Sequence, residues 1–399
     1  MKVLVAKEQR AGETRVAATP ETVKKMVKAG LAVAVEEGAG LAAHFDDDAF
    51  REAGAEVAAA GAGWSAADVV LTVNAPGAPA VGTMREGALL VGLLAPHHNP
   101  EMVRAAVERR VTALAMELVP RISRAQSMDA LSSQASIAGY KAVALAAWRL
   151  PRYFPLLMTA AGTVPPAKVV VMGAGVAGLQ AIATARRLGA QVEVSDIRPA
   201  VKEQVQSLGG KFIELPLEES GEGQGGYAKE MGEDFLRRQR EIVARHLAAA
   251  DVVVTTALVP GKPAPRLVTR EMIAGMKRGA VVVDLAIEQG GNVELSQADE
   301  EVVADGVLIL APSNLAATMA HDASVLYARN VFALLKEMVS EGEMALDLED
   351  EVVAGSLLTH AGQVHHAPTA ERLGTGAPAA APGPARPANE PANHEVTVE

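Results

Sequence analysis

Short apolar stretches alternate with amphipathic ones along the first 116 residues. The apolar runs are typical of buried strands, and the stretches between them have the spacing of amphipathic helices. Because strands alternate with helices, the pattern predicts a mostly parallel sheet with helices on both faces. The predicted strands are residues 3–6, 31–35, 69–73, 88–94 and 111–116, and the predicted helices are residues 20–29, 47–53 and 100–110.

A second alternation of the same kind begins at Lys168 and predicts a second doubly wound domain. The fold class is therefore α/β, with two domains at residues 1–135 and 136–322. A polar stretch over 117–135 and an Ala-rich helix over about 136–149 connect them. The second domain has predicted strands at residues 169–172, 192–195, 252–255, 281–285 and 307–310, and predicted helices at residues 176–188, 199–208, 233–248 and 269–276.

The C-terminal region of the chain changes character twice. A helix over about 323–339 is expected to return the chain to the first domain, which residues 323–372 then complete. Residues 374–399 are rich in Pro and Ala, a composition that cannot bury a core and indicates a semi-rigid linker or tether. Residues 218–232, EESGEGQGGYAKEMG, form a Gly-rich, charged insertion that is either mobile and functional or simply disordered.

Composition removes several classes of function. The chain has no Cys, which excludes a disulfide framework, a thiolate zinc site, an iron–sulfur cluster and a Cys nucleophile. A net charge of −11 with no basic stripe argues against nucleic-acid binding. The uncharged segment 169–185 is short for a membrane span, and its glycines indicate a strand, a tight turn and a helix start, so we expect no direct membrane insertion.

No metal-ligand spacing is present in the sequence, so we expect no metal site. The histidines occur partly as the adjacent pairs His97-His98 and His365-His366, and neighbouring residues do not easily converge on one ion. We expect both pairs to face solvent.

The sharpest motif is the glycine pattern Gly173-Ala174-Gly175-Val176-Ala177-Gly178, which follows a predicted strand and opens a predicted helix. Gly173 permits the tight turn, Gly175 lets the backbone approach a pyrophosphate, and Gly178 allows the helix to pack closely on the sheet. The first turn of the helix, with Val176, then offers amide donors to the phosphates. This context predicts a dinucleotide site.

Asp196 ends the next predicted strand, 23 residues after Gly173. A carboxylate there accepts hydrogen bonds from the adenosine ribose and repels a 2′-phosphate. Arg198 offers a charge that attracts such a phosphate, but the position of Asp196 favours NAD(H) over NADP(H). At the end of a later strand, Leu258 packs either on the nucleotide or simply in the core.

The segment Arg121–Asp129, RISRAQSMD, carries many hydrogen-bonding groups where the first domain hands over to the second. One interpretation is a solvated connection with Asp129 or Ser132 as the N-cap of the next helix. The other is a loop over the inter-domain cleft that fixes a nicotinamide, since ligand sites favour domain interfaces. The residues alone leave both open.

At this point the chain resembles the soluble NAD(H)-binding component, in its split form, of proton-translocating NAD(P) transhydrogenases. The similarity runs from Lys7-Glu8 and Glu13-Thr14-Arg15-Val16 to Thr359-His360. Its most specific motifs are PRISRAQSMDALSSQA at 120–135, MTAAGTVPPAKVVVMGAGVAGLQAIATARRLGA at 158–190 and GGYAKEMG at 225–232. The resemblance implies two Rossmann-like domains with the nucleotide in the cleft between them.

The resemblance also implies roles for residues at matching positions. Arg121, Gln126 and Asp129, together with Ser132, belong to the loop that orients the nicotinamide, and the first three are the implied catalytic residues. The glycine turn binds the pyrophosphate. The other implied nucleotide contacts are Asp196, Ile197 and Arg198 at the adenosine ribose, Leu258, and Gly226 and Tyr227 in a loop that closes on bound nucleotide.

The assembly is implied in the same way. Members of this family form homodimers and pass hydride directly between NAD(H) on this component and NADP(H) on a partner component. A membrane-spanning partner couples the transfer to proton translocation. The resemblance therefore places the chain in the cytoplasm, attached through its partners to the inner face of the cell membrane.

Alanine dehydrogenase, a member of the same superfamily, is the leading alternative. The sequence departs from that pattern, because Asn74-Ala75-Pro76 stands where a substrate-gripping Lys-Glu-Pro is expected, and residues 92–96 lack the expected catalytic His. Without an acid or base, oxidation of an amino acid is hard to support. Arg15, the carboxylate ligand of the dehydrogenases, is retained. A non-catalytic NAD-sensing module is a third hypothesis, suggested only by the linker-like tail.

Overall fold

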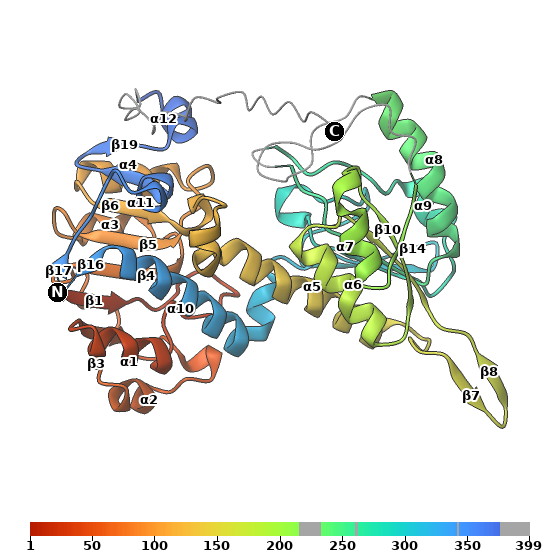
Figure 1. The fold of residues 1–399 in the computed structure, drawn as a ribbon, viewed down its shortest axis with the longest axis horizontal. Helices are drawn as coiled ribbons and strands as arrows, with labels where there is room; N and C mark the ends of the chain where they lie inside the picture. Colours follow the sequence, from red (N-terminus) through yellow and green to blue (C-terminus); the bar gives the residue numbers. More distant parts are fainter. Residues whose placement is uncertain (215–232, 260–261, 341–342, 376–399) are drawn as a thin grey trace, which may run out of the picture.

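Two helix-covered sheets form the two lobes of the molecule (Figure 1). The computed structural model describes residues 1–214, 233–259, 262–340 and 343–375. Both sheets are dominated by parallel pairs, as the alternating pattern predicts. The predicted α/β fold class is confirmed.

The first lobe is built on an eight-stranded sheet of order β19-β18-β6-β5-β4-β1-β2-β3. All five strands predicted for this domain are present, while the pattern does not predict β3 or the C-terminal pair β18 and β19. β18 runs antiparallel to β6, so the C-terminal region of the chain completes the sheet. The strands are β1 (Lys2–Val5), β2 (Ala32–Glu36), β3 (Glu56–Ala58), β4 (Val69–Asn74), β5 (Leu89–Leu93), β6 (Thr112–Ala115), β18 (Leu357–His360) and β19 (Gln363–Val364).

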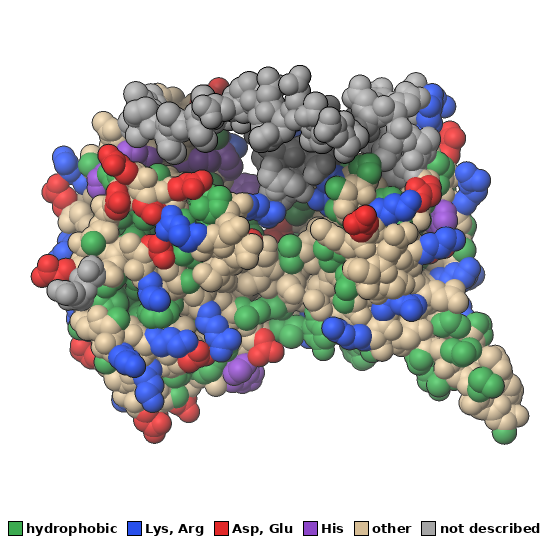
Figure 2. Space-filling view, in the orientation of Figure 1, with side chains coloured by type: hydrophobic (Ala, Val, Ile, Leu, Met, Phe, Trp, Pro, Cys, Tyr) green, Lys and Arg blue, Asp and Glu red, His purple; other side chains and the backbone are tan. Residues whose placement is uncertain are grey.

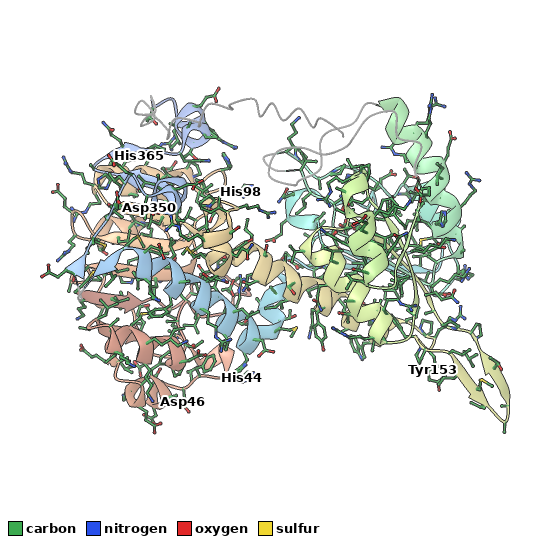
Figure 3. All side chains as sticks on the ribbon, viewed as in Figure 1. His44, Asp46, His98, Tyr153, Asp350 and His365 are labelled. Carbon is green, nitrogen blue, oxygen red and sulfur yellow. The ribbon has the colours of Figure 1, made fainter. Side chains whose placement is uncertain are left out.

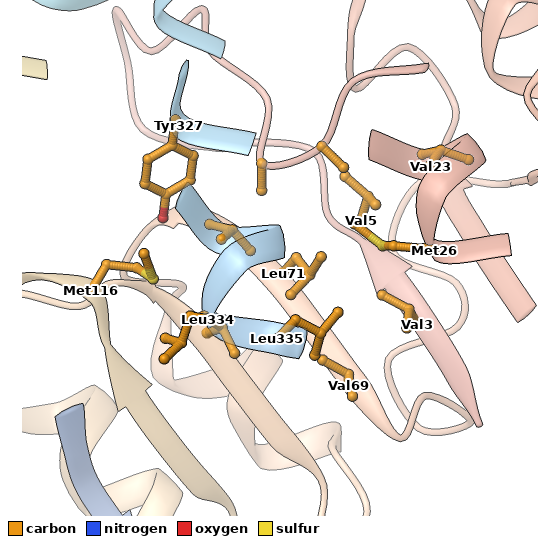
Figure 4. Packing of buried hydrophobic residues seen from close by; sticks show 14 of the residues in the cluster. Val3, Val5, Val23, Met26, Val69, Leu71, Met116, Tyr327, Leu334 and Leu335 are labelled. Carbon is orange, nitrogen blue, oxygen red and sulfur yellow. The ribbon is translucent and has the colours of Figure 1, made fainter. Parts of the chain in front are cut away.

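Helices cover both faces of this sheet, and the long helix α10 (Ala320–Glu337) returns to it from the second lobe, as predicted. Figure 4 shows its Tyr327, Leu334 and Leu335 packed against strand residues such as Leu71. The buried Tyr327 hydroxyl donates to the carbonyl oxygen of Thr72 at 2.8 Å, which satisfies its polar end. The other helices are α1 (Pro20–Lys28), α2 (Asp47–Glu52), α3 (Ala78–Thr83), α4 (Pro100–Glu108), α11 (Glu351–Ser356) and α12 (Ala367–Leu373).

The second lobe has a seven-stranded sheet of order β11-β10-β9-β12-β13-β15-β14. Its central strands are runs of Val buried on both faces, the composition expected where helices cover a parallel sheet. β14 is an unpredicted antiparallel edge strand. The elements are β9 (Lys168–Met172), α6 (Val176–Arg187), β10 (Gln191–Ser195), α7 (Lys202–Ser207), β11 (Lys211–Phe212), α8 (Glu233–Ala249), β12 (Val252–Thr255), α9 (Arg270–Ala274), β13 (Val281–Asp284), β14 (Glu301–Ala304) and β15 (Val307–Leu310).

Helix α5 (Ala130–Arg149) spans from one lobe to the other (Figure 1). It begins six residues before the predicted start at 136, because Asp129 caps it by accepting a hydrogen bond from the backbone N–H of Ser132. Beyond α5, an unpredicted hairpin, β7 (Leu157–Thr159) and β8 (Gly162–Val164), projects away from the second lobe. The smallest sheet pairs β16 (Val339–Ser340) with β17 (Glu343–Met344).

Candidate functional site

The glycine turn lies between β9 and α6, where the sequence predicts it. Gly173 has φ +102, and a Cβ there would lie 2.6 Å from the Thr256 hydroxyl. A Cβ on Gly178 would lie only 1.8 Å from the carbonyl oxygen of Gly173. Gly175, in contrast, faces open space, with nothing within 4 Å of an added Cβ. The first two positions thus require glycine for the fold, whereas Gly175 leaves the turn open to a ligand.

The N-terminus of α6 is available for anion binding. Its N-cap is Gly175, which has no side chain to cap the first amides, and no acidic residue lies in the first turn. The exposed N–H groups and the helix dipole both favour a negatively charged group. Val176, the first helical residue, is exposed. This arrangement suits a phosphate, as the motif predicts.

Asp196 follows β10 and is almost completely buried beside the turn. One carboxylate oxygen accepts from the N–H of Ala174 at 2.7 Å, which ties the second strand to the glycine turn. The Arg198 guanidinium forms two further bonds to the same carboxylate, Nε to Oδ1 at 2.9 Å and Nη2 to Oδ2 at 2.8 Å. Ile197 is half-buried against the neighbouring apolar cluster. Arg198 therefore offsets the charge of Asp196 in this structure.

The end of β12 supports the turn from the other side. The Thr256 hydroxyl donates to the carbonyl oxygen of Gly173 at 3.1 Å. The next residue, Ala257, exchanges hydrogen bonds with the buried side chain of Asn292. Leu258 is half-buried at the same edge, and its contact with a nucleotide stays a prediction.

Buried Asp284 organises the loop that carries Asn292. Its carboxylate accepts from the Thr255 hydroxyl at 2.8 Å, from the N–H groups of Asn292 and Val293, and from the Ser296 hydroxyl. The sequence places Asp284 at the ligand edge but does not identify Asn292, because nothing in its local sequence shows that it bridges two strand ends.

The polar segment at 121–129 folds onto the first lobe. Ser123–Met128 form a 3-10 helix, and Asp129 caps α5 through both its carboxylate oxygens, which accept from the N–H and the hydroxyl of Ser132. The N-cap interpretation is therefore confirmed for Asp129. Arg121 and Gln126 have exposed side chains. The orienting role of these residues stays a prediction.

Side chains from distant regions of the chain hold this segment. Asn330 of α10 donates to the carbonyl oxygen of Ser127 at 2.8 Å and accepts from the Ser133 hydroxyl at 2.7 Å. Arg124 pairs with both Glu337 and Asp350. Local sequence gives no sign of these anchors, because they lie some 200 residues further along the chain.

A buried ionic network lies beside the start of α5. Glu13 accepts from Arg15 in a bidentate pair, Nε to Oε1 at 2.8 Å and Nη2 to Oε2 at 2.7 Å. Arg15 also donates to Gln134 of α5 and to Asn314. Burial raises the pKa of Glu13, but hydrogen bonds and charge from Arg15 outweigh it and lower the pKa to about 2. Arg15 is thus engaged by a carboxylate of its own chain.

Two more acidic side chains are buried nearby. Glu8 accepts from the N–H of Val73 and from the Asn74 amide, and Glu117 accepts from the N–H groups of Leu94 and Ala95. Burial raises the pKa of both carboxyl groups. Asn74 therefore binds the chain's own carboxylates at the position where the dehydrogenase pattern requires a Lys.

The expectation that both histidine pairs face solvent is wrong. His98 is exposed, but His97, His365 and His366 are half-buried. The rings of His97 and His366 have centroids 6.0 Å apart, and those of His360 and His365 lie 5.9 Å apart. These histidines gather on the first lobe (Figures 2 and 3) because β18, β19 and α12 pack against α4.

The described ranges contain neither a metal cluster nor a membrane-spanning helix. Within them, no three His, Cys, Asp or Glu side chains are grouped so that they can hold a metal ion. None of their helices combines the length and the apolar character needed to cross a bilayer. Gly226 and Tyr227, assigned to the closing loop, lie outside the described residues.

Comparison with known families covers nearly the whole chain. Residues 4–138 match the model of the alanine dehydrogenase/PNT N-terminal domain, and residues 142–367 match that of the C-terminal domain. The first segment of the divided NAD(P) transhydrogenase subunit alpha of Rhodospirillum rubrum is 50% identical over 376 residues, which cover 92% of this chain and 98% of that protein.

A solved structure and a dehydrogenase complete the comparison. The crystal structure of transhydrogenase from Sinorhizobium meliloti is 49% identical with a TM-score of 0.83, covering 91% of this chain and 100% of that one. Alanine dehydrogenase 2 of Staphylococcus aureus is 30% identical over 327 residues, covering 79% of this chain and 81% of that protein. The similarity to the transhydrogenase subunit is therefore much the stronger, which confirms the resemblance inferred from the motifs.

Proposed function

The chain belongs to the alanine dehydrogenase/PNT family, and from that premise we propose that it is the NAD(H)-binding subunit of an NAD(P) transhydrogenase. In this proposal, hydride passes directly between the nicotinamide of NAD(H) on this chain and that of NADP(H) on a partner component. One nicotinamide is oxidised as the other is reduced, and no further co-reactant is needed. The similarity to the subunit from R. rubrum over almost its full length supports this reaction.

The observation that carries nucleotide binding is the open space opposite Gly175 at the uncapped start of α6. Backbone donors at that point suit the pyrophosphate, and buried Asp196 stands beside them for the adenosine ribose. The side chain of Arg198 is turned onto Asp196 in a bidentate pair. This pairing favours NAD(H) over NADP(H), because the guanidinium is directed at the carboxylate.

The dehydrogenase alternative is weaker on the same structure. The Arg15 guanidinium is held by the Glu13 carboxylate, and Asn74 binds Glu8 and Glu13. Residues 92–96 carry no His to act as acid or base. Transfer between two nicotinamides needs neither; it requires that the rings be held about 3–3.5 Å apart with water excluded. We assign that orienting role to Arg121, Gln126 and Asp129.

The proposed assembly includes a second copy of this chain. Large apolar side chains are exposed at the end of α5 and on the hairpin that follows it: Trp148 is 76% exposed, Tyr153 59%, Leu156 53% and Met158 79%. Figure 3 shows Tyr153 at the base of the projecting hairpin. A cluster of this kind is typical of a surface that another protein covers. We assign it to a homodimer interface.

The remaining partners follow from the subunit name of the relatives. We propose that the chain works with an NADP(H)-binding component and with membrane-spanning subunits that couple hydride transfer to proton translocation. It then lies at the inner face of the cell membrane, held there by those partners.

Reconstitution tests the proposal. The purified chain is mixed with its NADP(H)-binding partner, NADPH and an oxidised NAD analogue, and reduction of the analogue is followed. Reduction that requires both proteins is expected. Alanine-dependent formation of NADH by the chain alone would instead establish the dehydrogenase, and the absence of any transfer with a folded, nucleotide-loaded partner would reject the transhydrogenase.

A further inference from the structure

Helices α5 and α6 touch through their backbones at one buried glycine. A Cβ added to Gly139 of α5 would lie 2.1 Å from the carbonyl oxygen of Ala177, 2.8 Å from its carbonyl carbon and 3.0 Å from its Cα. Ala177 is the fifth residue of the glycine turn motif and lies in the first turn of α6. The connecting helix therefore packs directly on the proposed pyrophosphate site.

The opposite end of α5 is fixed to the first lobe. The Ser133 hydroxyl donates to the Asn330 side chain, and the Gln134 amide donates to the carbonyl oxygen of Ala323. Asp129 begins the helix, and the segment with Gln126 immediately precedes it. Ten residues of α5 separate Asp129 from Gly139, a rise of about 15 Å along the axis. One rigid helix thus connects the orienting segment to the glycine turn.

We propose that Gly139 is a positioning residue for hydride transfer. By allowing α5 to approach the backbone of α6, it sets the separation between the segment 121–132, which orients the nicotinamide, and the turn 173–178, which holds the pyrophosphate. The inference rests on the proposed function. It adds a residue that touches no nucleotide and acts through the placement of two other regions.

Alanine at this position has to push the helices apart. An ordinary contact between a methyl carbon and a neighbouring atom is near 3.5 Å, so the backbone has to retreat by about 1 Å. A displacement of about 1 Å remote from the chemistry reduces a rate by up to roughly a hundredfold, because transfer depends steeply on the alignment of the reacting atoms. The pyrophosphate turn and Asp196 keep their own geometry, so binding changes less than transfer.

The test compares Gly139→Ala with Gly82→Ala in the full chain. Gly82 also lies in a helix, α3, but an added Cβ there meets nothing within 4 Å, so it is the matched control. NADH affinity is measured by titration, and the single-turnover rate is measured with NADH saturating and the partner component loaded with NADP⁺. For Gly139→Ala we expect transfer to be slower by roughly tenfold or more, with a dissociation constant within about threefold of wild type. Gly82→Ala is expected to match wild type in both.

Equal transfer rates for wild type and Gly139→Ala would overturn the inference. If Gly139→Ala does not fold, Ser136→Ala decides, because it removes the Ser136–Gln180 hydrogen bond at the same crossing without adding bulk. A slower transfer at unchanged NADH affinity supports the inference, and an unchanged rate overturns it. An inactive wild type with a competent partner would instead reject the proposed function, which keeps the two failures distinct.

Discussion

The glycine turn at residues 173–178 and the polar segment at residues 121–132 both belong to the proposed site, but they are built in different ways. The turn is determined locally: a buried strand, three glycines and a helix start create its shape and its anion-binding donors. The polar segment takes its shape from distant groups, such as Asn330 and Glu337 of α10. Binding chemistry can thus reside in a short motif, whereas orientation depends on the arrangement of two lobes.

The largest expected effect tests the distant anchoring of the polar segment. Glu13→Gln leaves the buried Arg15 without a full counter-charge, and we expect a loss of stability of about 3 kcal/mol. Thermal unfolding measures it. The exposed pair of Glu21 with Lys25 and Arg329 supplies the control, since Glu21→Gln is expected to cost about 0.5 kcal/mol. An equal loss in both variants would contradict the anchoring role of the buried pair.

The same carboxyl group gives a pH dependence. Because the pKa of folded Glu13 is lowered to about 2 from 4.5, its contribution is fully present above pH 4.5 and is lost as the pH falls toward 2. Unfolding followed over this range is expected to show a steeper loss for wild type than for Glu13→Gln. Parallel curves would show that the Glu13 carboxylate is not stabilised in the folded protein.

Alanines in the glycine turn test its local character. Gly178→Ala collides with the carbonyl oxygen of Gly173, so it is expected to weaken NADH binding by roughly a hundredfold, about 2.8 kcal/mol, and to lower the melting temperature. Gly175→Ala is expected to weaken binding without lowering the melting temperature, since its Cβ meets only open space. Calorimetry gives both quantities. Unchanged NADH affinity in Gly175→Ala would remove the turn from the binding site.

Asp196→Ala tests the selection of the nucleotide. We expect NADH affinity to fall by about tenfold to a hundredfold, because hydrogen bonds to a charged group are lost. NADPH affinity is expected to rise, because the repelling charge is gone and Arg198 is released from its pair. Titrations with both nucleotides measure the change, and an unaltered ratio of the two affinities would be incompatible with the role of Asp196.

The smallest expected effect concerns the start of α5. Asp129→Ala removes the N-cap, which is worth about 1 kcal/mol, and loosens the polar segment while leaving the turn intact. A modest drop in melting temperature with nearly unchanged NADH affinity is expected. A large loss of affinity would show instead that Asp129 binds the nucleotide directly.

The elements that the sequence predicts are those with a local signature. All ten predicted strands are present, because runs such as Val252–Thr255 are apolar and bounded by turns. The pattern does not predict the edge strands β14, β18 and β19, since they are short and pair with distant partners. It also misses the early start of α5, because the first residues, ALSSQAS, show no helical periodicity and are helical through tertiary packing.

The site divides in the same way. The turn and Asp196 lie where the motif predicts, because spacing along a strand–turn–helix unit fixes their positions. Asn292, Asn330 and Glu117 carry no local signal, and their contacts exist only after the chain has folded. The clustering of His97 with His366 also depends on segments far apart in sequence. Periodicity cannot report such contacts.

The most direct test of the division between binding and orientation is the single-turnover rate of Gln126→Ala. Gln126 is exposed on the polar segment, so its loss leaves the turn unchanged. With NADH saturating and an NADP⁺-loaded partner, we predict transfer slower by roughly tenfold or more, while the NADH dissociation constant stays within about tenfold of wild type. A rate that returns to the wild-type value at saturation would contradict this division, because Gln126 would then contribute to binding alone.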